Sequence, residues 1–206
     1  MYIQITTRCN MSCEHCCFAC TAKGEDMSQK VYEQALTLCD GYIIIGGGEP
    51  TLHPLFNNFL MQAMGEGSVW LATNGSITKT ALLLAKLAKQ GVIGCALSQD
   101  QYHDYINPEV IIAFDKSIGY HNQEDLREFR SVTTIHSGGR ATENEIWEKE
   151  DCGCAGGIIK PNGDIYMCAC NDAPKIGTVW DYDYDNKYSE YDCYTYFKED
   201  NQEEIA

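Results

Sequence analysis

The sequence predicts an α/β fold: a partial (β/α) barrel of parallel strands, followed by a small C-terminal region that contains a β-hairpin. Two observations carry this prediction. Between residues 2 and 135, short apolar strands alternate with helical stretches, as in a parallel sheet joined by right-handed crossovers. After residue 140 the alternation stops, and two apolar segments flank Pro161-Asn162-Gly163-Asp164, whose Asn-Gly pair is a strong hairpin signal. The strand–helix units are too few for a complete eight-stranded barrel, so we expect an open or partial one.

The expected strands are short and apolar. The first is rich in β-branched side chains, which favour extended backbone. The second is a continuous apolar run, as is typical of parallel strands that are buried on both faces. The expected strands cover residues 2–6, 42–45, 69–72, 92–97 and 127–135.

The expected helices have recognisable start and stop signals. Ser28 can cap the first helix through its hydroxyl group. Gly91 is suited to end the third, and Pro108 occupies the first position of the fourth. The expected helices cover residues 28–39, 54–64 and 79–90, with a further one starting at residue 107.

We place a domain boundary near residue 145, where the strand–helix pattern has ended. Residues 1–145 then form the partial barrel. Residues 146–206 form a smaller domain with the hairpin and an acidic tail rich in tyrosine. We expect this tail to be a solvated surface, with a slight preference for a peptide partner.

Charge and hydropathy exclude several classes of protein. The 206 residues carry a formal net charge of −15, which argues against a nucleic-acid partner, because phosphate contacts need clustered Lys and Arg. No apolar stretch approaches the length of a membrane span. The first eight residues lack the basic start and apolar run of a signal peptide. We therefore expect a cytoplasmic protein that binds neither nucleic acid nor membrane.

The cysteines fall into two groups. Of twelve, five lie in residues 9–20 and four in residues 152–170. Disulfides are disfavoured in the reducing cytosol, so clustered thiols there indicate metal or redox chemistry. Two groups suggest two metal sites.

The first group contains Cys9, Cys13 and Cys16, in the spacing Cys-x3-Cys-x2-Cys. Structural zinc sites usually have four protein ligands, so three thiolates on one loop fit zinc poorly. A 4Fe–4S cluster accepts thiolates as soft ligands, and with three cysteines it leaves one iron open to another ligand. On spacing alone the cluster is the better interpretation, without excluding zinc.

A second motif, Gly46-Gly47-Gly48-Glu49-Pro50-Thr51, follows the second expected strand. Glycines let the backbone approach a ligand closely, and ligands bind at the C-terminal ends of parallel strands. With Cys9, Cys13 and Cys16 after the first strand and Gly47-Gly48-Glu49-Pro50 after the second, the sequence resembles the radical S-adenosylmethionine (radical SAM) superfamily. The resemblance extends to about Arg140.

The resemblance implies a cofactor arrangement and an activity. Cys9, Cys13 and Cys16 would hold three irons of a 4Fe–4S cluster, and SAM would chelate the fourth. Gly47, Gly48 and Glu49 would surround the SAM amino group, largely through backbone carbonyls. An external donor such as a flavodoxin or ferredoxin would supply an electron. Cleavage of SAM would then give methionine and a 5′-deoxyadenosyl radical that abstracts a substrate hydrogen.

Three further residues match cofactor-binding positions of the family, and a fourth, Arg140, is a candidate from its place after the fifth strand. His15 precedes the third cysteine, where relatives often carry an aromatic residue beside the adenine. Asn74 and Ser98 end the third and fourth strands, where polar groups contact SAM. Arg140 could pair with a carboxylate. Packing, loop capping or a surface position are the alternative interpretations. His103 could relay protons or contact substrate, although a lone loop histidine is more often incidental.

The second cysteine group resembles the SPASM and twitch extensions of radical SAM enzymes, which bind auxiliary iron–sulfur clusters. The hairpin between Ile158 and Met167 is the context expected for them. The resemblance implies one auxiliary 4Fe–4S cluster, with zinc in the same ligands as the alternative. Cys193 could replace one ligand. The implied ligands are Cys152, Cys154, Cys168 and Cys170.

The function implied is a radical SAM enzyme acting on a substrate that is a peptide or a small molecule. A peptide being crosslinked, epimerised or oxidised is the first choice. A glycyl-radical-enzyme activase is the alternative, and a non-catalytic iron–sulfur or zinc protein is the alternative of another class. Cys17 and Cys20 exceed the three-ligand motif. We expect them to pack beside the loop, a redox or substrate-linking role being the alternative.

Overall fold

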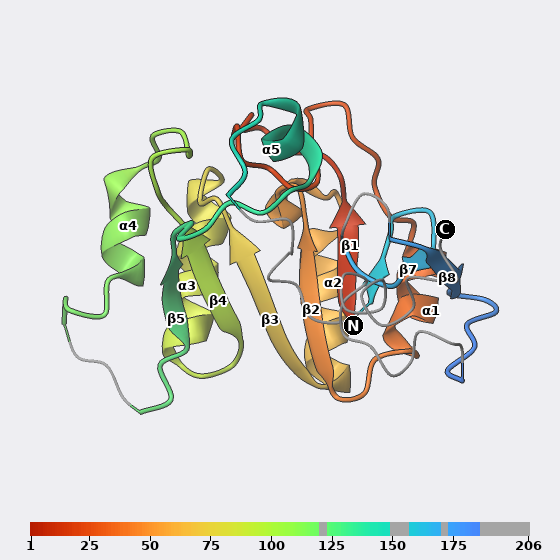
Figure 1. Cartoon of the computed structure of the whole chain (residues 1–206). Coiled ribbons are helices and arrows are strands. Elements are labelled where there is room, and N and C mark those ends of the chain that lie inside the picture. Colours follow the sequence, from red (N-terminus) through yellow and green to blue (C-terminus); the bar gives the residue numbers. More distant parts are fainter. Residues whose placement is uncertain (120–122, 149–156, 170–172, 186–206) are drawn as a thin grey trace.

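A computed structural model describes residues 1–119, 123–148, 157–169 and 173–185. Its centre is an eight-stranded sheet in the order β5-β4-β3-β2-β1-β6-β7-β8 (Figure 1). The strands are β1 (Tyr2–Thr6), β2 (Tyr42–Gly47), β3 (Ser68–Thr73), β4 (Gly94–Ser98), β5 (Arg127–Arg130), β6 (Ile158–Ile159), β7 (Asp164–Tyr166) and β8 (Lys175–Thr178). The helices are α1 (Gln29–Leu36), η1 (Pro50–Leu52, a 3-10 turn), α2 (Phe56–Glu66), α3 (Thr78–Lys89), α4 (Pro108–Phe114) and α5 (Gly139–Glu143).

Strands β1 to β5 run parallel, with a helix between successive strands, so the predicted α/β partial barrel is confirmed. The C-terminal ends of these strands therefore lie along one edge of the sheet. Helix α5 sits at this edge, beyond the tips of the strand arrows in Figure 1. The parallel register places the segments that follow β1, β2, β3 and β4 side by side, as a site at this edge requires.

The predicted hairpin is also present, as β6 and β7 pair antiparallel across Pro161-Asn162-Gly163. Strand β6 runs parallel to β1, with Tyr2 opposite Ile158. The hairpin thus extends the barrel sheet from its β1 side and brings residues of the C-terminal region close to the segment after β1. The division of the chain near residue 145 stays a prediction.

Two expected elements are shorter in the structure. We expected a strand over residues 127–135, but β5 ends at Arg130. Beyond it, the Val132 amide donates to a carboxylate oxygen of Asp100 (3.0 Å), so the chain turns across the strand ends. The first helix ends at Leu36, and the Thr37 hydroxyl donates to the Gln34 carbonyl (2.7 Å). Side-chain hydrogen bonds of this kind compete with the backbone hydrogen bonds that would extend the helix.

One apolar core joins the helices to one face of the sheet. Ile3, Ile5, Ile45 and Leu71 alternate along their strands with residues of the opposite face, and all four are buried in this core. Between α1 and α2, the rings of Tyr32 and Phe59 stack with centroids 3.9 Å apart, and the Tyr32 hydroxyl donates to the Phe59 carbonyl. Because the helices cover this face, the opposite face and the strand ends are left to form a cavity.

Among the described residues, no helix combines the length and apolar character that crossing a membrane demands.

Candidate active site

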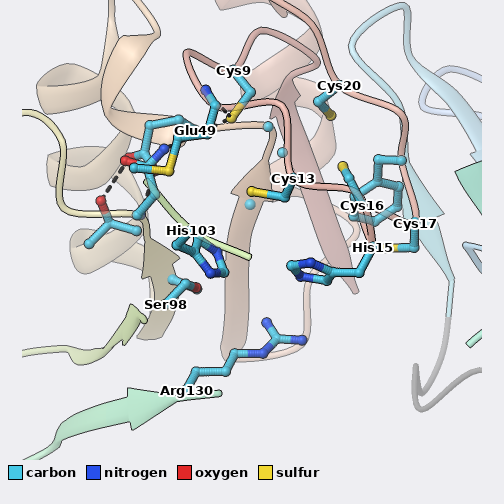
Figure 2. Close-up of a pocket in the computed structure, with 18 of the residues that line it drawn as sticks. Cys9, Cys13, His15, Cys16, Cys17, Cys20, Glu49, Ser98, His103 and Arg130 are labelled. Atoms are coloured by element: carbon cyan, nitrogen blue, oxygen red, sulfur yellow. Dashed lines mark hydrogen bonds between the residues drawn. The ribbon is translucent and has the colours of Figure 1, made fainter. Parts of the chain in front are cut away.

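A cavity of about 270 Å³ lies at the C-terminal ends of the parallel strands (Figure 2). It brings together residues from five separate segments of the chain. Most of the residues that we predicted for the main site line it. They are Cys9, Cys13, His15, Cys16, Gly47, Gly48, Glu49, Asn74 and Ser98.

The cysteine loop (residues 9–20) follows β1 and is closed at its base. The Cys9 amide donates to the Thr21 carbonyl (2.9 Å), and the Thr21 amide donates back to the Thr7 carbonyl. Within the loop, the Cys16 amide donates to the Cys13 carbonyl (3.2 Å) and the Met11 amide to the Cys9 sulfur (3.4 Å). Met11 is buried in the core. The backbone therefore holds the loop over the cavity and turns its thiols toward it.

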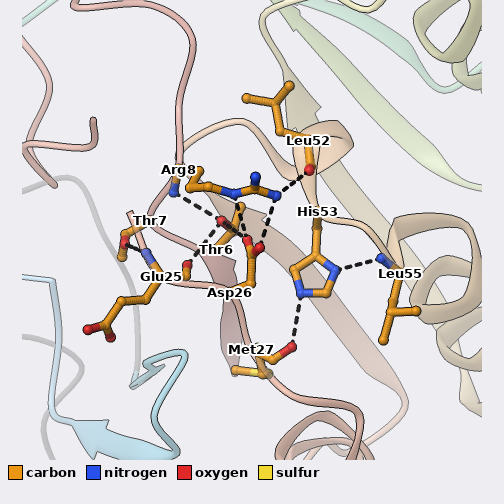
Figure 3. A network of polar contacts seen from close by, with 9 residues as sticks. All are labelled: Thr6, Thr7, Arg8, Glu25, Asp26, Met27, Leu52, His53 and Leu55. Atoms are coloured by element: carbon orange, nitrogen blue, oxygen red, sulfur yellow. Dashed lines mark hydrogen bonds and ion pairs between the residues drawn. The ribbon is translucent and has the colours of Figure 1, made fainter. Parts of the chain in front are cut away.

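Arg8 fixes the base of this loop to the neighbouring segments (Figure 3). Its guanidinium forms an ion pair with Asp26 (2.9 Å) and donates to the Leu52 carbonyl (2.6 Å). Asp26 also accepts from the Thr6 hydroxyl, and the buried His53 bonds the Met27 carbonyl (2.9 Å). The network thus joins the start of the cysteine loop to the segments before α1 and after β2.

Arg140 lies beneath the cysteine loop, contrary to our expectation. Its Nε donates to the Cys13 carbonyl (2.9 Å) and its Nη1 to the Cys20 carbonyl (2.6 Å), while its amide donates to the Cys16 carbonyl (2.9 Å). It is not among the described residues that line the cavity. The guanidinium is therefore engaged by backbone carbonyls of the cysteine loop. We had expected it to pair with a carboxylate.

The glycines at the end of β2 and directly after it are required by close packing against the end of β1. Gly47 has φ +150°, and a Cβ atom there would lie 2.2 Å from the Thr6 carbonyl oxygen. A Cβ on Gly48 would lie 2.2 Å from the Arg8 carbonyl oxygen and 3.0 Å from the Cys9 Cβ. Only glycine fits here. The backbone of this segment is thus held directly beside the first cysteine.

The Glu49 carboxylate is buried and ties the end of β2 to β3. It accepts hydrogen bonds from the Thr51 hydroxyl (2.6 Å), the Thr73 hydroxyl (2.8 Å) and the Asn74 amide (2.7 Å). Burial raises the pKa of this carboxyl, and the hydrogen bonds oppose that rise. Because its side chain is engaged in this way, Glu49 can offer a ligand its backbone rather than its carboxylate.

Asn74 connects β3 to the cysteine loop. Its Nδ2 donates to Asn10 Oδ1 (3.1 Å) and lies 3.9 Å from the Cys9 sulfur. Ser98 ends β4 and lines the cavity opposite the cysteines (Figure 2). Both polar groups therefore border the space in front of the thiols.

The three predicted ligand thiols differ in acidity. Burial raises the pKa of Cys13 to about 11 and also raises that of Cys9. Interaction with the neighbouring Cys20 thiol lowers the pKa of Cys16 and raises that of Cys20. Cys20 also lines the cavity, beside the third predicted ligand.

The donor set of the cavity fits an iron–sulfur cluster better than a single ion. In the part of the chain that the structure describes, no three Cys, His, Asp or Glu side chains are grouped to hold one metal ion. In a cubane cluster each cysteine binds a different iron, so three thiolates need not meet at one point. Three soft thiols on one loop, lining a cavity beside a glycine segment that packs against the start of that loop, are the observations that fit this group.

A pair formed by His103 and Asp100 borders the cavity. His103 Nδ1 lies 2.7 Å from Asp100 Oδ1. Burial acts to raise the pKa of Asp100, but hydrogen bonds from the Tyr102 amide, His103 and the Val132 amide lower it overall. The His15 ring lies with its centroid 5.5 Å from that of His103 and 4.7 Å from that of Tyr102. His15, which precedes the third cysteine of the motif, thus packs against the rings of Tyr102 and His103.

Sequence reasoning missed Arg130, which ends β5 and reaches toward His15 in the cavity (Figure 2). Polar residues at the ends of other strands were candidates, and Arg130 could have been found in the same way. It was overlooked because the fifth strand was expected to continue to residue 135, which placed Arg130 inside a strand.

Of the second cysteine group, only Cys168 can be described. It is buried and follows β7 of the hairpin. The auxiliary cluster stays a prediction, because its other implied ligands lie outside the described residues. They are Cys152, Cys154, Cys170 and the alternative Cys193.

Comparison with known proteins adds independent findings. Residues 3–139 match the family described as the radical SAM superfamily. A protein of Pyrococcus furiosus, described as a tungsten-containing aldehyde ferredoxin oxidoreductase cofactor-modifying protein, is 33% identical over 100 residues, or 45% of this chain. The match spans 28% of that protein, so the chain corresponds to little more than a quarter of the curated relative.

Solved structures resemble the chain over nearly its whole length. BtrN in complex with AdoMet (SAM) and 2-DOIA has a TM-score of 0.61 at 14% identity, covering 96% of this chain and 84% of BtrN. Native anSMEcpe with bound AdoMet has a TM-score of 0.59 at 16% identity, covering 96% of this chain and 83% of anSMEcpe. A further anSMEcpe structure holds AdoMet and the Cp18Cys peptide (TM-score 0.58, 15% identity, 96% and 82%). At these identities the likeness is one of fold.

Proposed function

The chain belongs to the radical SAM superfamily, and from that premise we propose that it is an enzyme that uses a SAM-derived radical to modify a peptide. The family implies a 4Fe–4S cluster and SAM as cofactors. We assign the cluster to Cys9, Cys13 and Cys16, and SAM to the cavity that they share with residues 47–49. When bound and reduced, the cluster would supply the electron for the reductive cleavage of SAM, and through it the abstraction of a hydrogen atom from the substrate.

The residues of the chain position this cofactor pair. Gly47 and Gly48 let the backbone pack beside Cys9, where it borders the proposed SAM site, and Glu49 keeps that backbone in place through its bonds to β3. Asn74 and Ser98 offer polar groups at the two neighbouring strand ends.

Arg130 takes the carboxylate-binding role that we first gave to Arg140. Its guanidinium borders the cavity at the end of β5. Arg140 is engaged with the carbonyls of the cysteine loop, so it holds the loop. A guanidinium matches a carboxylate in geometry and charge, and SAM carries a carboxylate. His15 lies where it can contact the adenine.

A peptide is the substrate class that we favour. Its support is the fold shared with anSMEcpe, a structure of which holds the Cp18Cys peptide. BtrN, with the same fold, holds 2-DOIA, so a small molecule is the alternative substrate. An external flavodoxin or ferredoxin would deliver the electron.

An auxiliary 4Fe–4S cluster is part of the proposal. Its support is the hairpin, which buries Cys168 at the end of β7, and the cysteines that flank it in the sequence. Such a cluster could accept an electron from a substrate radical or help to hold the substrate.

The observation that carries the proposal is the single cavity shared by Cys9, Cys13, Cys16 and the Gly47-Gly48-Glu49 backbone. The test is electron paramagnetic resonance of the anaerobically reconstituted, dithionite-reduced protein before and after SAM is added. A cluster with an open iron changes its spectrum on binding SAM. Cys13→Ala should lose this response and Cys39→Ala, a change of the same type outside the cavity, should keep it. A spectrum of the intact protein that SAM leaves unchanged would contradict the proposal.

A further inference from the structure

A second cavity, of about 430 Å³, lies between the cysteine loop and the hairpin. We call it the Lys160 cavity. The loop contributes Cys17 and Phe18, and α5 contributes the exposed Glu143. The hairpin and the segment after it contribute Lys160, Tyr166 and Cys168, so the cavity adjoins the proposed auxiliary cluster. Cys17 and Phe18 also line the main cavity, so the two spaces share a wall.

Lys160 is the cation of this cavity. Its Nζ lies 5.2 Å from the centroid of the Phe18 ring and 5.9 Å from that of the Tyr166 ring, so aromatic faces surround the charge. Among the described residues, no carboxylate forms an ion pair with it, including Glu143 of the same cavity. Burial lowers the pKa of Lys160, as is expected of a partly desolvated ammonium group.

The neighbouring lysine shows the contrast. Lys175 lies on β8, and its Nζ forms an ion pair with Asp164 at 2.6 Å. Most of the described Lys and Arg side chains form no ion pair, so the feature that sets Lys160 apart is its half-buried position beside two aromatic rings. An ammonium group in this position can receive a negative charge from a ligand.

We propose that the Lys160 cavity binds a carboxylate of the substrate, with the Lys160 ammonium as its ion partner and Phe18 and Tyr166 as its walls. Its assignment to the substrate rests on the proposed function. In this arrangement the reacting residue of the peptide enters the main cavity. The peptide chain then runs past Cys17 and Phe18, and one of its acidic groups contacts Lys160. This carboxylate is either an aspartate or glutamate side chain or a peptide C-terminus.

The test measures the acetylation rate of each lysine by mass spectrometry in the full, anaerobically reconstituted chain. Three peptides are compared. Acetyl-Gly-Glu-Gly-amide carries a side-chain carboxylate, acetyl-Gly-Gln-Gly carries a C-terminal carboxylate, and acetyl-Gly-Gln-Gly-amide carries neither. We expect saturable protection of Lys160 by one or both acidic peptides, and the effective one identifies the source of the carboxylate. The neutral peptide should leave Lys160 unprotected, and none should protect Lys175.

Lys160→Met and Lys175→Met form a matched pair for calorimetric binding of the effective peptide. Removing a charged hydrogen-bonding partner should weaken binding about tenfold in Lys160→Met and leave it unchanged in Lys175→Met. Equal acetylation of Lys160 with all three peptides would overturn the proposal. The proposal would also be overturned if cluster reconstitution alone protected Lys160 and the acidic peptides had no further effect. A group within the protein would then fill the cavity. The proposed function fails separately, through the response of the cluster to SAM.

Discussion

Arg140 Nε donates a hydrogen bond of 2.9 Å to the carbonyl oxygen of Cys13, which lies 127 residues earlier in the chain. The contact joins the segment after β5 to the loop after β1. It therefore closes the open end of the strand series over the site. The cysteine loop depends on the whole partial barrel for its shape, although its motif is local in sequence.

Replacing Arg140 by Met should loosen this loop. The variant loses two charged hydrogen bonds to loop carbonyls, which should lower the free energy of unfolding by about 3 kcal/mol. Cluster content after reconstitution should fall with it. Denaturant unfolding and iron analysis check this. Unchanged iron content and stability would mean that the loop does not need the arginine.

Replacing Arg130 by Met should weaken SAM binding while the fold and the cluster stay intact. Loss of a guanidinium–carboxylate pair should raise the Kd for SAM by about tenfold or more. Equilibrium dialysis measures the Kd, and Arg130→Lys should recover part of the affinity because it restores the charge without the fork. A Kd that both variants leave unchanged would remove Arg130 from the SAM site.

Gly48→Ala should disrupt the site, and Gly65→Ala is its matched control. The new Cβ at residue 48 would meet the Arg8 carbonyl at 2.2 Å, whereas the Cβ at residue 65 on α2 meets nothing within 4 Å. We expect a loss of about 2–3 kcal/mol and reduced cluster content for Gly48→Ala. The control should gain up to about 1 kcal/mol from better helix propensity. Equal thermal stability of the two variants would contradict the close packing described here.

The buried pair Asp125 and Arg127 should make stability depend on acid pH. Their side chains are 1% and 3% exposed, and the hydrogen bonds from Arg127 lower the pKa of Asp125 to about 2. The unfolded carboxyl titrates near about 3.9, so the pair should contribute about 2 kcal/mol above that pH and lose it as the pH falls toward 2. Asp125→Asn should therefore be less stable than the parent at pH 7, with a gap that narrows between about pH 4 and pH 2. A gap independent of pH in denaturant titrations would show that the ion pair is not its cause.

The proposed auxiliary cluster can be tested by counting the irons that remain without the first site. In the Cys9→Ala/Cys13→Ala/Cys16→Ala triple variant, about four irons per chain should remain after reconstitution. Iron, sulfide and zinc analysis of the same sample checks this. If zinc alone remained, the second metal site would exist without being an iron–sulfur cluster.

Sequence reasoning located the parallel strands and the main-site motifs because their signals are local. Strand periodicity and the spacing of Cys9, Cys13 and Cys16 are read within a few residues. The roles of Arg130 and Arg140 were not predictable in this way. They depend on where β5 ends, which is decided by the distant bond between Val132 and Asp100. The Lys160 cavity was missed for the same reason, because it forms only where the hairpin meets the cysteine loop.

The most direct test of the central claim is the cleavage of SAM itself. The anaerobically reconstituted protein, incubated with SAM and dithionite, should form 5′-deoxyadenosine and methionine in equal amounts, as measured by liquid chromatography. Cys16→Ala should abolish both products, and Cys39→Ala should retain them. Absence of 5′-deoxyadenosine from the parent protein, with its cluster shown to be fully assembled, would contradict the account.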